Sequence, residues 1–274
     1  MKIEKIINNN IISAKDEKNQ EVILMGRGIG FGRKKGESID LSRIEKIFKR
    51  ESGKEFNRFK EILMHTPIEQ VDVADNVVRY AKRILNNSLD KDIYLSMTQF
   101  INSYVDKEFT GLPEIPYDAK VMNQYFKVEY MIGAFAQEEM FQILGIRTTE
   151  KFASYIALFV VSAEYGGSLE MALQMVGLIS RMLGIVERCF PGEVHHEGVR
   201  YESCVAHLRY IASFVLNREQ KNHQPTNKDF LESQYRREYR CGKKIREYIK
   251  KTYDFELSDE EELYLLIHIR LITM

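Results

Sequence analysis

Residues able to bind a polyanion gather between positions 25 and 35, where glycines alternate with cations and one aromatic residue. The segment reads Met-Gly-Arg-Gly-Ile-Gly-Phe-Gly-Arg-Lys-Lys. Glycine lets a backbone approach a ligand closely, cations neutralise phosphates, and the ring of Phe31 offers a face on which a base can stack. Upstream, Asn8, Asn9 and Asn10 supply amides that can read base edges. Together these residues indicate a nucleic-acid surface.

A nucleotide-binding loop and a decorated hairpin turn are the alternatives for such a glycine string. The phosphate-cradling pattern G-x-x-x-x-G-K-[ST] is absent, and no helical pattern follows Gly30 directly, as the dinucleotide fingerprint requires. Charge favours the nucleic-acid interpretation, because residues 1–50 carry a formal charge of +5 while the 274-residue chain as a whole is neutral. A basic head on a mildly acidic body is expected to meet polyanions.

The composition argues against a membrane protein, a secreted protein and a zinc site built on cysteine pairs. No apolar stretch comes near the roughly 18–20 residues of a membrane span, the longest candidate being 156–163, and the N-terminus lacks the apolar core of a signal peptide. Three cysteines without a pattern fit a reducing cytoplasm and exclude a zinc site built on cysteine pairs. We therefore expect a cytoplasmic protein with no membrane insertion, no metal and no cofactor.

The elements that position the glycine segment are predicted to be strands. Apolar pairs in residues 3–12 precede a polar turn at 16–20, and the apolar run 22–25 follows it, which predicts a hairpin. Residues 38–41 are predicted to add another short strand. Such a small sheet makes a marginal core, so a dimer would stabilise it.

From about residue 57 the apolar spacing becomes helical, and this part contains a repeat. Three anchors recur in order, at offsets of 107, 109 and 109: Tyr94-x5-Phe100 as Tyr201-x5-His207, Glu129-Tyr130-x2-Gly133 as Glu238-Tyr239-x2-Gly242, and Thr149-x5-Tyr155-x3-Phe159 as Ser258-x5-Tyr264-x3-His268. A nearly constant offset indicates a duplicated helical domain of roughly 105 residues.

His207 and His268 occupy the positions of the second copy that Phe100 and Phe159 occupy in the first. A lone histidine on an apolar helix is usually a hydrogen-bonded core residue. Two in corresponding positions favour a nucleophilic role, because an imidazole with a pKa of about 6.5 can act as a nucleophile at neutral pH. The other histidines fall in linkers or loops, where we expect them to be solvated, and none has the HExxH spacing of a metal site: His65, His195, His196 and His223.

The basic β-head, the duplicated helical part and the paired histidines together resemble the BglG/SacY-type transcriptional antiterminators of bacterial sugar operons. The resemblance covers the whole chain. Its strongest matches are Lys2-Ile3-x-Lys5-Ile6-Ile7-Asn8-Asn9-Asn10, Met25-Gly26-Arg27-Gly28-x-Gly30-Phe31, Ile156-Ala157-Leu158 and Leu263-Tyr264-Leu265-x-Ile267-His268-Ile269.

The resemblance implies a multidomain fold with β and all-α parts. Residues 1–56 correspond to a co-antiterminator RNA-binding domain, a small antiparallel β-sheet that works as a dimer. Residues 65–170 and 171–274 correspond to two α-helical bundle domains, the first and second regulation domains, which the sugar phosphotransferase system phosphorylates on histidine. The implied protein is not an enzyme.

The implied function is antitermination. The head binds a hairpin in the nascent leader RNA and prevents an overlapping terminator, so that polymerase continues into sugar-utilisation genes. The implied partners are this RNA, a second copy of the chain, the general phosphocarrier protein and a sugar permease. The implied RNA contacts are Lys5, Asn8, Asn10, Gly26, Arg27, Gly28 and Phe31.

The resemblance also assigns the phosphoacceptors, which are His207 and His268 of the second domain. The corresponding residues of the first domain, Phe100 and Phe159, cannot accept phosphate, so we expect this domain to have lost its phosphate switch. Two arrangements are open for these rings: each fills the core of its own domain, or each faces a second copy.

Two other classes of function are alternatives to RNA binding. A phosphotransfer protein could relay phosphate through His207 or His268, although we find no second acid–base pair and no nucleotide or substrate loop. A DNA-binding operon activator could share the regulation domains, but it would carry a helix-turn-helix where residues 1–35 have a β-pattern.

Overall fold

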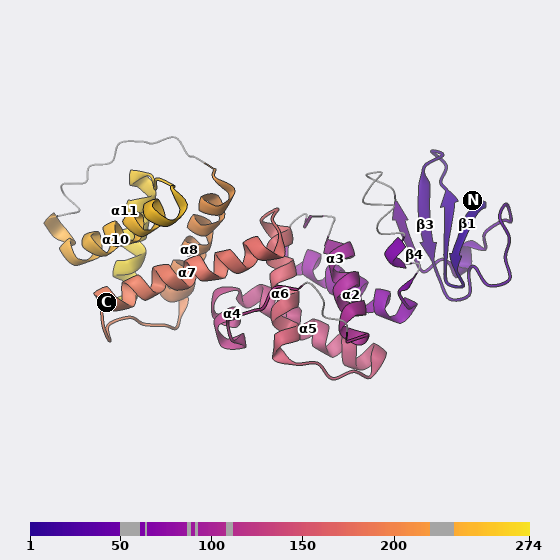
Figure 1. Ribbon diagram of the computed structural model, residues 1–274, viewed down its shortest axis with the longest axis horizontal. Coiled ribbons are helices and arrows are strands. Elements are labelled where there is room, and N and C mark those ends of the chain that lie inside the picture. The colour runs from indigo at the N-terminus through magenta and orange to yellow at the C-terminus, as the bar shows by residue number, and fades with distance from the viewer. Residues whose placement is uncertain (50–60, 64, 87–88, 91–92, 108–111, 220–232) are drawn as a thin grey trace. The chain divides into compact units, whose positions relative to one another are not determined.

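The chain begins with a four-stranded antiparallel sheet. The computed structural model describes residues 1–49, 61–63, 65–86, 89–90, 93–107, 112–219 and 233–274. The strands follow one another in sheet order (Figure 1): β1 Ile3–Asn8, β2 Ile11–Lys15, β3 Glu21–Met25 and β4 Lys46–Lys49. The predicted polar turn joins β2 to β3, where Oδ1 of Asp16 accepts hydrogen bonds from the backbone N–H groups of Lys18 and Gln20. The predicted hairpin is confirmed.

The strand predicted at residues 38–41 is wrong. Ser38 makes only an isolated bridge to Lys2, and the chain then forms the 3-10 helix η1, Leu41–Arg43. Asp40 caps this helix by accepting a hydrogen bond from the N–H of Ser42, a local contact that competes with strand pairing. The fourth strand is β4, which the sequence pattern did not predict.

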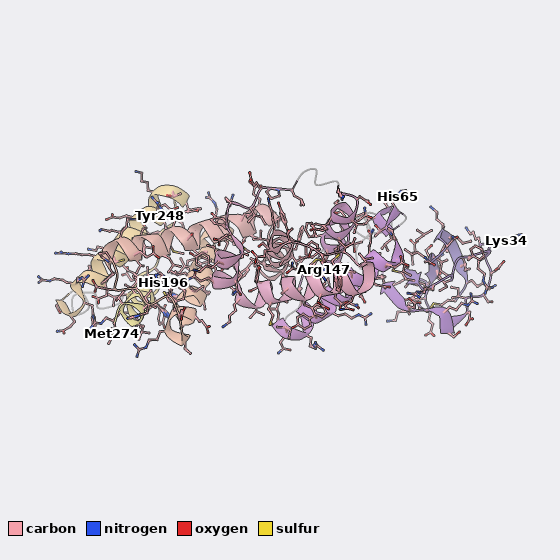
Figure 2. The ribbon with its side chains drawn as sticks, turned by 90° about the horizontal axis from the view of Figure 1, so that it is seen from below. Lys34, His65, Arg147, His196, Tyr248 and Met274 are labelled. Atoms are coloured by element: carbon pink, nitrogen blue, oxygen red, sulfur yellow. The ribbon has the colours of Figure 1, made fainter. Side chains whose placement is uncertain are left out.

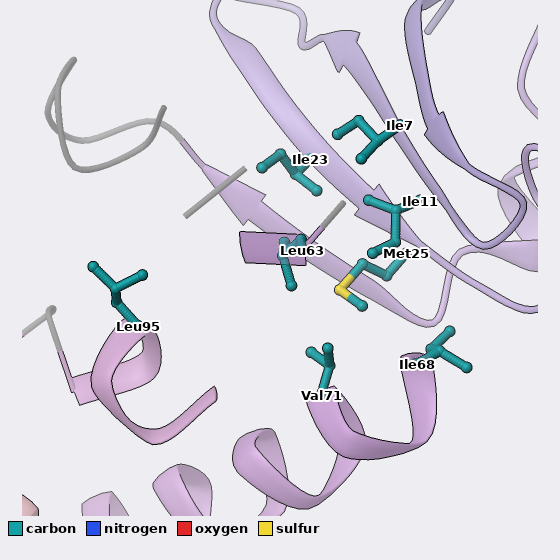
Figure 3. Packing of buried hydrophobic residues seen from close by; sticks show 8 residues of the cluster. All are labelled: Ile7, Ile11, Ile23, Met25, Leu63, Ile68, Val71 and Leu95. Atoms are coloured by element: carbon teal, nitrogen blue, oxygen red, sulfur yellow. The ribbon is translucent and has the colours of Figure 1, made fainter. Parts of the chain in front are cut away.

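The sheet is buried on both faces, because successive side chains of a strand point to opposite sides. One face forms a core inside the N-terminal part: Ile3, Ile12, Ala14, Val22, Leu24 and Ile29. The other face shares a core with the helical segments that follow it (Figure 3): Ile7, Ile11, Ile23, Met25, Leu63, Ile68, Val71 and Leu95. At the edge of this second core the rings of Phe48 and Tyr94 pack edge to face, 5.8 Å apart.

The regular elements after the sheet are helices in the described part of the chain. The chain as a whole, sheet included, divides into two compact units. Unit 1 consists of the sheet and the helices of residues 1–114 and 128–164: α2 Ile68–Leu85, α3 Ile93–Val105, α5 Lys127–Leu144 and α6 Glu150–Glu164. Unit 2 consists of residues 115–127 and 165–274: α4 Ala119–Tyr125, α7 Leu169–Cys189, α8 Val199–Asn217, α10 Arg236–Tyr253 and α11 Asp259–Ile272.

The predicted duplication is visible in the order and packing of the helices. The matched anchors lie on α3 and α8, on α5 and α10, and on α6 and α11. In unit 1, α3 packs against α2 and α6, and in unit 2, α8 packs correspondingly against α7 and α11. The predicted fold class, a small sheet followed by duplicated helical bundles, is confirmed.

Helix α4 packs within unit 2, although its place in the repeat belongs to the first copy. The hydroxyl groups of Tyr125 and Ser180 are 3.3 Å apart, the amide of Gln124 donates to the hydroxyl of Tyr201 (2.8 Å), and Lys127 pairs with Glu202 (2.8 Å) just beyond the helix. The division into compact units thus differs from the domain boundaries that the resemblance implies, and those boundaries remain a prediction.

Helix α7 corrects the prediction that no apolar stretch approaches the length of a membrane span. Its 21 residues are long and apolar enough to cross a membrane, because Glu170 and Arg181 are the only charges before its last turn. Half of the apolar window is buried inside the protein. Met175, Ile179 and Met182 are fully buried on this helix, which packs against α8 and α10. Core helices of this kind satisfy the same criterion of length and composition.

Candidate nucleic-acid interface and histidine site

Two segments that are distant in the sequence are hydrogen-bonded to each other in the head. The N–H of Gly26 donates to the carbonyl of Asn10 (3.0 Å) and the N–H of Gly30 to the carbonyl of Asn9 (2.9 Å). The side-chain Oδ1 of Asn10 accepts from the N–H of Gly28 (2.8 Å). The turn between β1 and β2 therefore joins the glycine segment, and we call residues 8–10 and 26–32 the turn–loop surface.

The turn–loop surface exposes the groups that nucleic acids require. Phe31 is 72% exposed, the largest exposed fraction of any aromatic side chain that the structure describes. Arg27 and Lys5 are exposed as well, and Lys34, which follows closely along the chain, lies at the outer margin of the head (Figure 2). An exposed ring among cations is the combination with which proteins stack bases and neutralise the backbone of unpaired strands.

The glycines of this surface also have roles in the fold. A Cβ at Gly26 would collide with the backbone carbonyl of Arg43, so that no other residue fits there without a shift. Gly28 has a φ of +65°, a conformation that glycine adopts freely, and open space surrounds it. The roles of these residues in RNA binding stay predictions, and the side chain of Asn8 lies outside what the structure describes.

In unit 2, the structure brings together the two histidines that the repeat singled out. The rings of His207 on α8 and His268 on α11 are 4.8 Å apart and inclined by 35°. Nε2 of His207 lies 3.3 Å from Oε2 of Glu261, in the first turn of α11. The side chains of His207 and Glu261 are only 10% and 7% exposed. We call these three residues the histidine site.

The surroundings of His268 favour the neutral form of its imidazole. Burial, and secondarily the neighbouring His207, lower the pKa of His268 below its ordinary value. A neutral imidazole carries the lone pair that attacks phosphorus, whereas imidazolium does not. The rings of Tyr210 and Tyr264 lie about His207 at 6.3 and 6.0 Å, and both tyrosines are partly exposed.

An aromatic cluster occupies the equivalent place in unit 1. Phe100 lies 5.3 Å from both Phe152 and Phe159. Phe100 and Phe159 are 2% and 8% exposed. The arrangement in which each ring fills the core of its own domain is therefore confirmed, and the alternative in which the rings face a second copy is wrong, because almost no ring surface is left to contact one.

Sequence reasoning missed one member of each cluster. The offset of 109 residues that aligns Phe159 with His268 also aligns Phe152 with Glu261. The signal was present in the repeat, but a glutamate in the first turn of a helix is also typical of capping and of the helix dipole. All three polar members of the histidine site thus have phenyl rings as their counterparts in unit 1.

The other histidines that the structure describes show no comparable arrangement. His65, His195 and His196 are exposed, as predicted, and His196 lies 3.8 Å from Glu187. His223 lies outside the described residues. Across the parts of the chain that the structure describes, no three His, Cys, Asp or Glu side chains are placed to hold a metal ion.

Comparisons with known proteins match both ends of the chain to families. Residues 1–57 match the CAT RNA binding domain and residues 195–271 match the PRD domain. The transcription antiterminator LicT of Bacillus subtilis (strain 168) is 34% identical, over 98% of either protein. The beta-glucoside operon antiterminator of Dickeya chrysanthemi is 30% identical, over 98% of this chain and 95% of that protein. The crystal structure of GlcT CAT-PRDI covers 59% of this chain and 96% of its own, at 26% identity and a TM-score of 0.48.

Proposed function

We propose that this chain binds a hairpin in a nascent leader RNA. The chain belongs to the family of transcription antiterminators with a CAT RNA-binding domain and a PRD domain. Binding stabilises the hairpin against an overlapping terminator, so that polymerase reads on into sugar-utilisation genes. The binding free energy needs only to exceed the difference in stability between the two competing RNA structures.

The turn–loop surface is the observation that carries this proposal. It exposes Phe31 for stacking and Arg27 for phosphate, on a segment that hydrogen bonds hold against the Asn9–Asn10 turn. In residues 1–49 the regular elements are four strands and one 3-10 helix, and this part has no recognition helix for the major groove of DNA. Unpaired RNA bases suit such a surface, because they can be stacked on a ring and read at their edges.

A gel-shift assay with the full chain tests this step. The probes are a labelled leader hairpin RNA and a duplex DNA of the same sequence. We expect the RNA to be retarded at protein concentrations that leave the DNA free. Equal or tighter binding of the duplex DNA would contradict the proposal and favour a DNA-binding activator.

Control of the protein is proposed to run through the histidine site. The general phosphocarrier protein of the sugar phosphotransferase system is the proposed donor, in the cytoplasm, and His207 and His268 are the proposed acceptors. A phosphoryl group adds close to two negative charges, and a site this poorly exposed must rearrange to accept them. Acid-labile phosphate on His207, His268 or both, mapped by mass spectrometry, is expected after incubation with the donor. Phosphate only on His65, His195, His196 or His223 would contradict the assignment.

The first helical domain, residues 65–170, is proposed to act as a dimerising spacer in a homodimer, without a phosphate switch of its own. Phe100 and Phe159 leave a sugar permease no acceptor at these positions. Deleting the permease in a reporter strain should therefore leave antitermination unchanged. A sharp rise in antitermination would mean that inhibitory phosphorylation acts on this protein elsewhere.

A further inference from the structure

Neither ring nitrogen of His207 is available to a phosphoryl donor, because Glu261 covers Nε2 and Nδ1 is buried. A carboxylate can only accept hydrogen bonds, so Nε2 of His207 donates to Oε2 of Glu261 and the free lone pair of the ring lies on Nδ1. Nδ1 is buried and has no hydrogen-bond partner among the residues that the structure describes. In this arrangement Nε2 carries a proton and a covering carboxylate, while Nδ1 is out of reach. His207 cannot attack phosphorus as it stands.

Glu261 is held in place by the beginning of its own helix. Its backbone N–H donates to Oγ of Ser258, the residue that caps α11 (3.1 Å), and Glu261 as a whole is 5% exposed. A negative side chain is also favoured in the first turn of a helix. The carboxylate that covers His207 is therefore part of the folded core of unit 2.

Unit 1 provides an internal comparison. Phe152, at the position equivalent to Glu261, packs against Phe100, at the position equivalent to His207. Where the acceptor histidine is absent, its carboxylate partner is absent too. The joint change indicates that Glu261 is present because of its contact with His207. Capping of α11 alone would not require the positions of Glu261 and His207 to differ together between the two units.

We propose that Glu261 is a positioning residue that keeps His207 from accepting a phosphoryl group, and that the carboxylate of Glu261 must be displaced before His207 is phosphorylated. This inference rests on the proposed function, which makes His207 an acceptor. Transfer forms a bond between phosphorus and Nε2 and breaks the phosphorus–nitrogen bond of a phosphohistidine donor, whose nitrogen keeps the electron pair. Beforehand, the displacement of Glu261 admits solvent to the ring, through which the ring proton passes from Nε2 to Nδ1. The carboxylate must also stay displaced after transfer, because the phosphoryl oxygens are negative and repel it strongly in a poorly exposed site.

The displacement of Glu261 gives phosphorylation a structural output. Once the carboxylate leaves Nε2, the first turn of α11 loses a contact to α8 that the unphosphorylated protein makes. The phosphoryl group then holds the two helices in a second arrangement, which is what a two-state regulatory element requires.

Phosphorylation kinetics test the proposal in the full-length chain. The parent carries His268→Ala, so that label from the phosphorylated carrier reports on His207 alone. We compare Glu261→Ala and the size-preserving Glu261→Gln with a matched control, Glu260→Gln, which changes an exposed glutamate of the same turn. We expect Glu261→Ala to raise the labelling rate on the order of tenfold, as loss of a charge-assisted hydrogen bond implies. Glu261→Gln should raise it less and Glu260→Gln should not change it. Rates at or below the parent's in both Glu261 variants would overturn the proposal.

The ring tautomer of His207 provides a second readout that needs no phosphate. Nitrogen chemical shifts of the unsubstituted protein should report the proton on Nε2, and Glu261→Gln should allow the Nδ1–H form to appear. A proton on Nδ1 in the unsubstituted protein would overturn the inference. If neither His207 nor His268 takes phosphate, the proposed control by phosphorylation fails, while the tautomer still decides whether Glu261 positions the ring.

Discussion

Replacing Phe31 by alanine should weaken binding of the leader hairpin and leave the fold intact. Because the side chain is 72% exposed, removing its ring forfeits little buried surface, and the free energy of unfolding should change by less than about 0.5 kcal/mol. A base stacked on an aromatic side chain is worth about 1–3 kcal/mol. This range corresponds to an increase in Kd of roughly 5- to 150-fold.

Fluorescence polarisation with a labelled hairpin measures the effect, at a fixed salt concentration because phosphate contacts make the affinity depend on salt. Phe31→Tyr keeps the stacking face and should bind within about twofold of the unsubstituted protein. Leu41→Ala is the matched control, because Leu41 is another exposed apolar residue of the head, 62% exposed, that lies outside the turn–loop surface. An unchanged Kd for Phe31→Ala would refute the placement of the RNA site, and an equal loss for Leu41→Ala would show a nonspecific apolar effect.

Three further predictions concern charge, packing and pH. Arg27→Ala should reduce the slope of log Kd against log salt by about one, because one phosphate contact is lost, and a salt titration with the hairpin measures this slope. Phe100→Ala should lower the free energy of unfolding by about 3–5 kcal/mol, whereas Met131→Ala, at a position 44% exposed, should change it by less than about 0.5 kcal/mol in urea denaturation. Because folding lowers the pKa of His268, the unfolded chain binds a proton at this residue more readily than the folded protein does. The contribution of His268 to the free energy of unfolding is therefore fully present above a pH of about 6.5, its ordinary pKa, and is lost as the pH falls below that value. Thermal melts across this range should show the loss, and His268→Phe should reduce it.

Alternation and turn chemistry in the sequence predicted most of the sheet. The polar turn after β2 was recognisable because aspartate and asparagine bond to nearby backbone groups. Strand β4 was missed because it is short, carries a lysine at both ends and is paired only along β3. Asp40 shows the opposite error, since a capping side chain was taken as part of a strand.

The sequence predicted the main residues of the candidate sites but not the contacts between them. The repeat singled out the two histidines that the structure brings together, because it aligned His207 and His268 with two phenylalanines. It did not predict that Glu261 covers His207, since that contact depends on how α8 and α11 pack, and no local pattern records it. The hydrogen bonds that join the Asn9–Asn10 turn to the glycine segment could not be predicted either, because they connect residues 16 or more positions apart, mostly through backbone groups.

Single-round transcription through the leader and its terminator tests the central claim most directly. The template carries the hairpin and terminator upstream of a reporter sequence, and the readout is the fraction of transcripts that extend past the terminator. The unsubstituted protein should raise this fraction in a concentration-dependent way, and Phe31→Ala should require a higher concentration for the same effect. An unchanged fraction at protein concentrations that saturate the hairpin would contradict the assignment of this chain as an antiterminator.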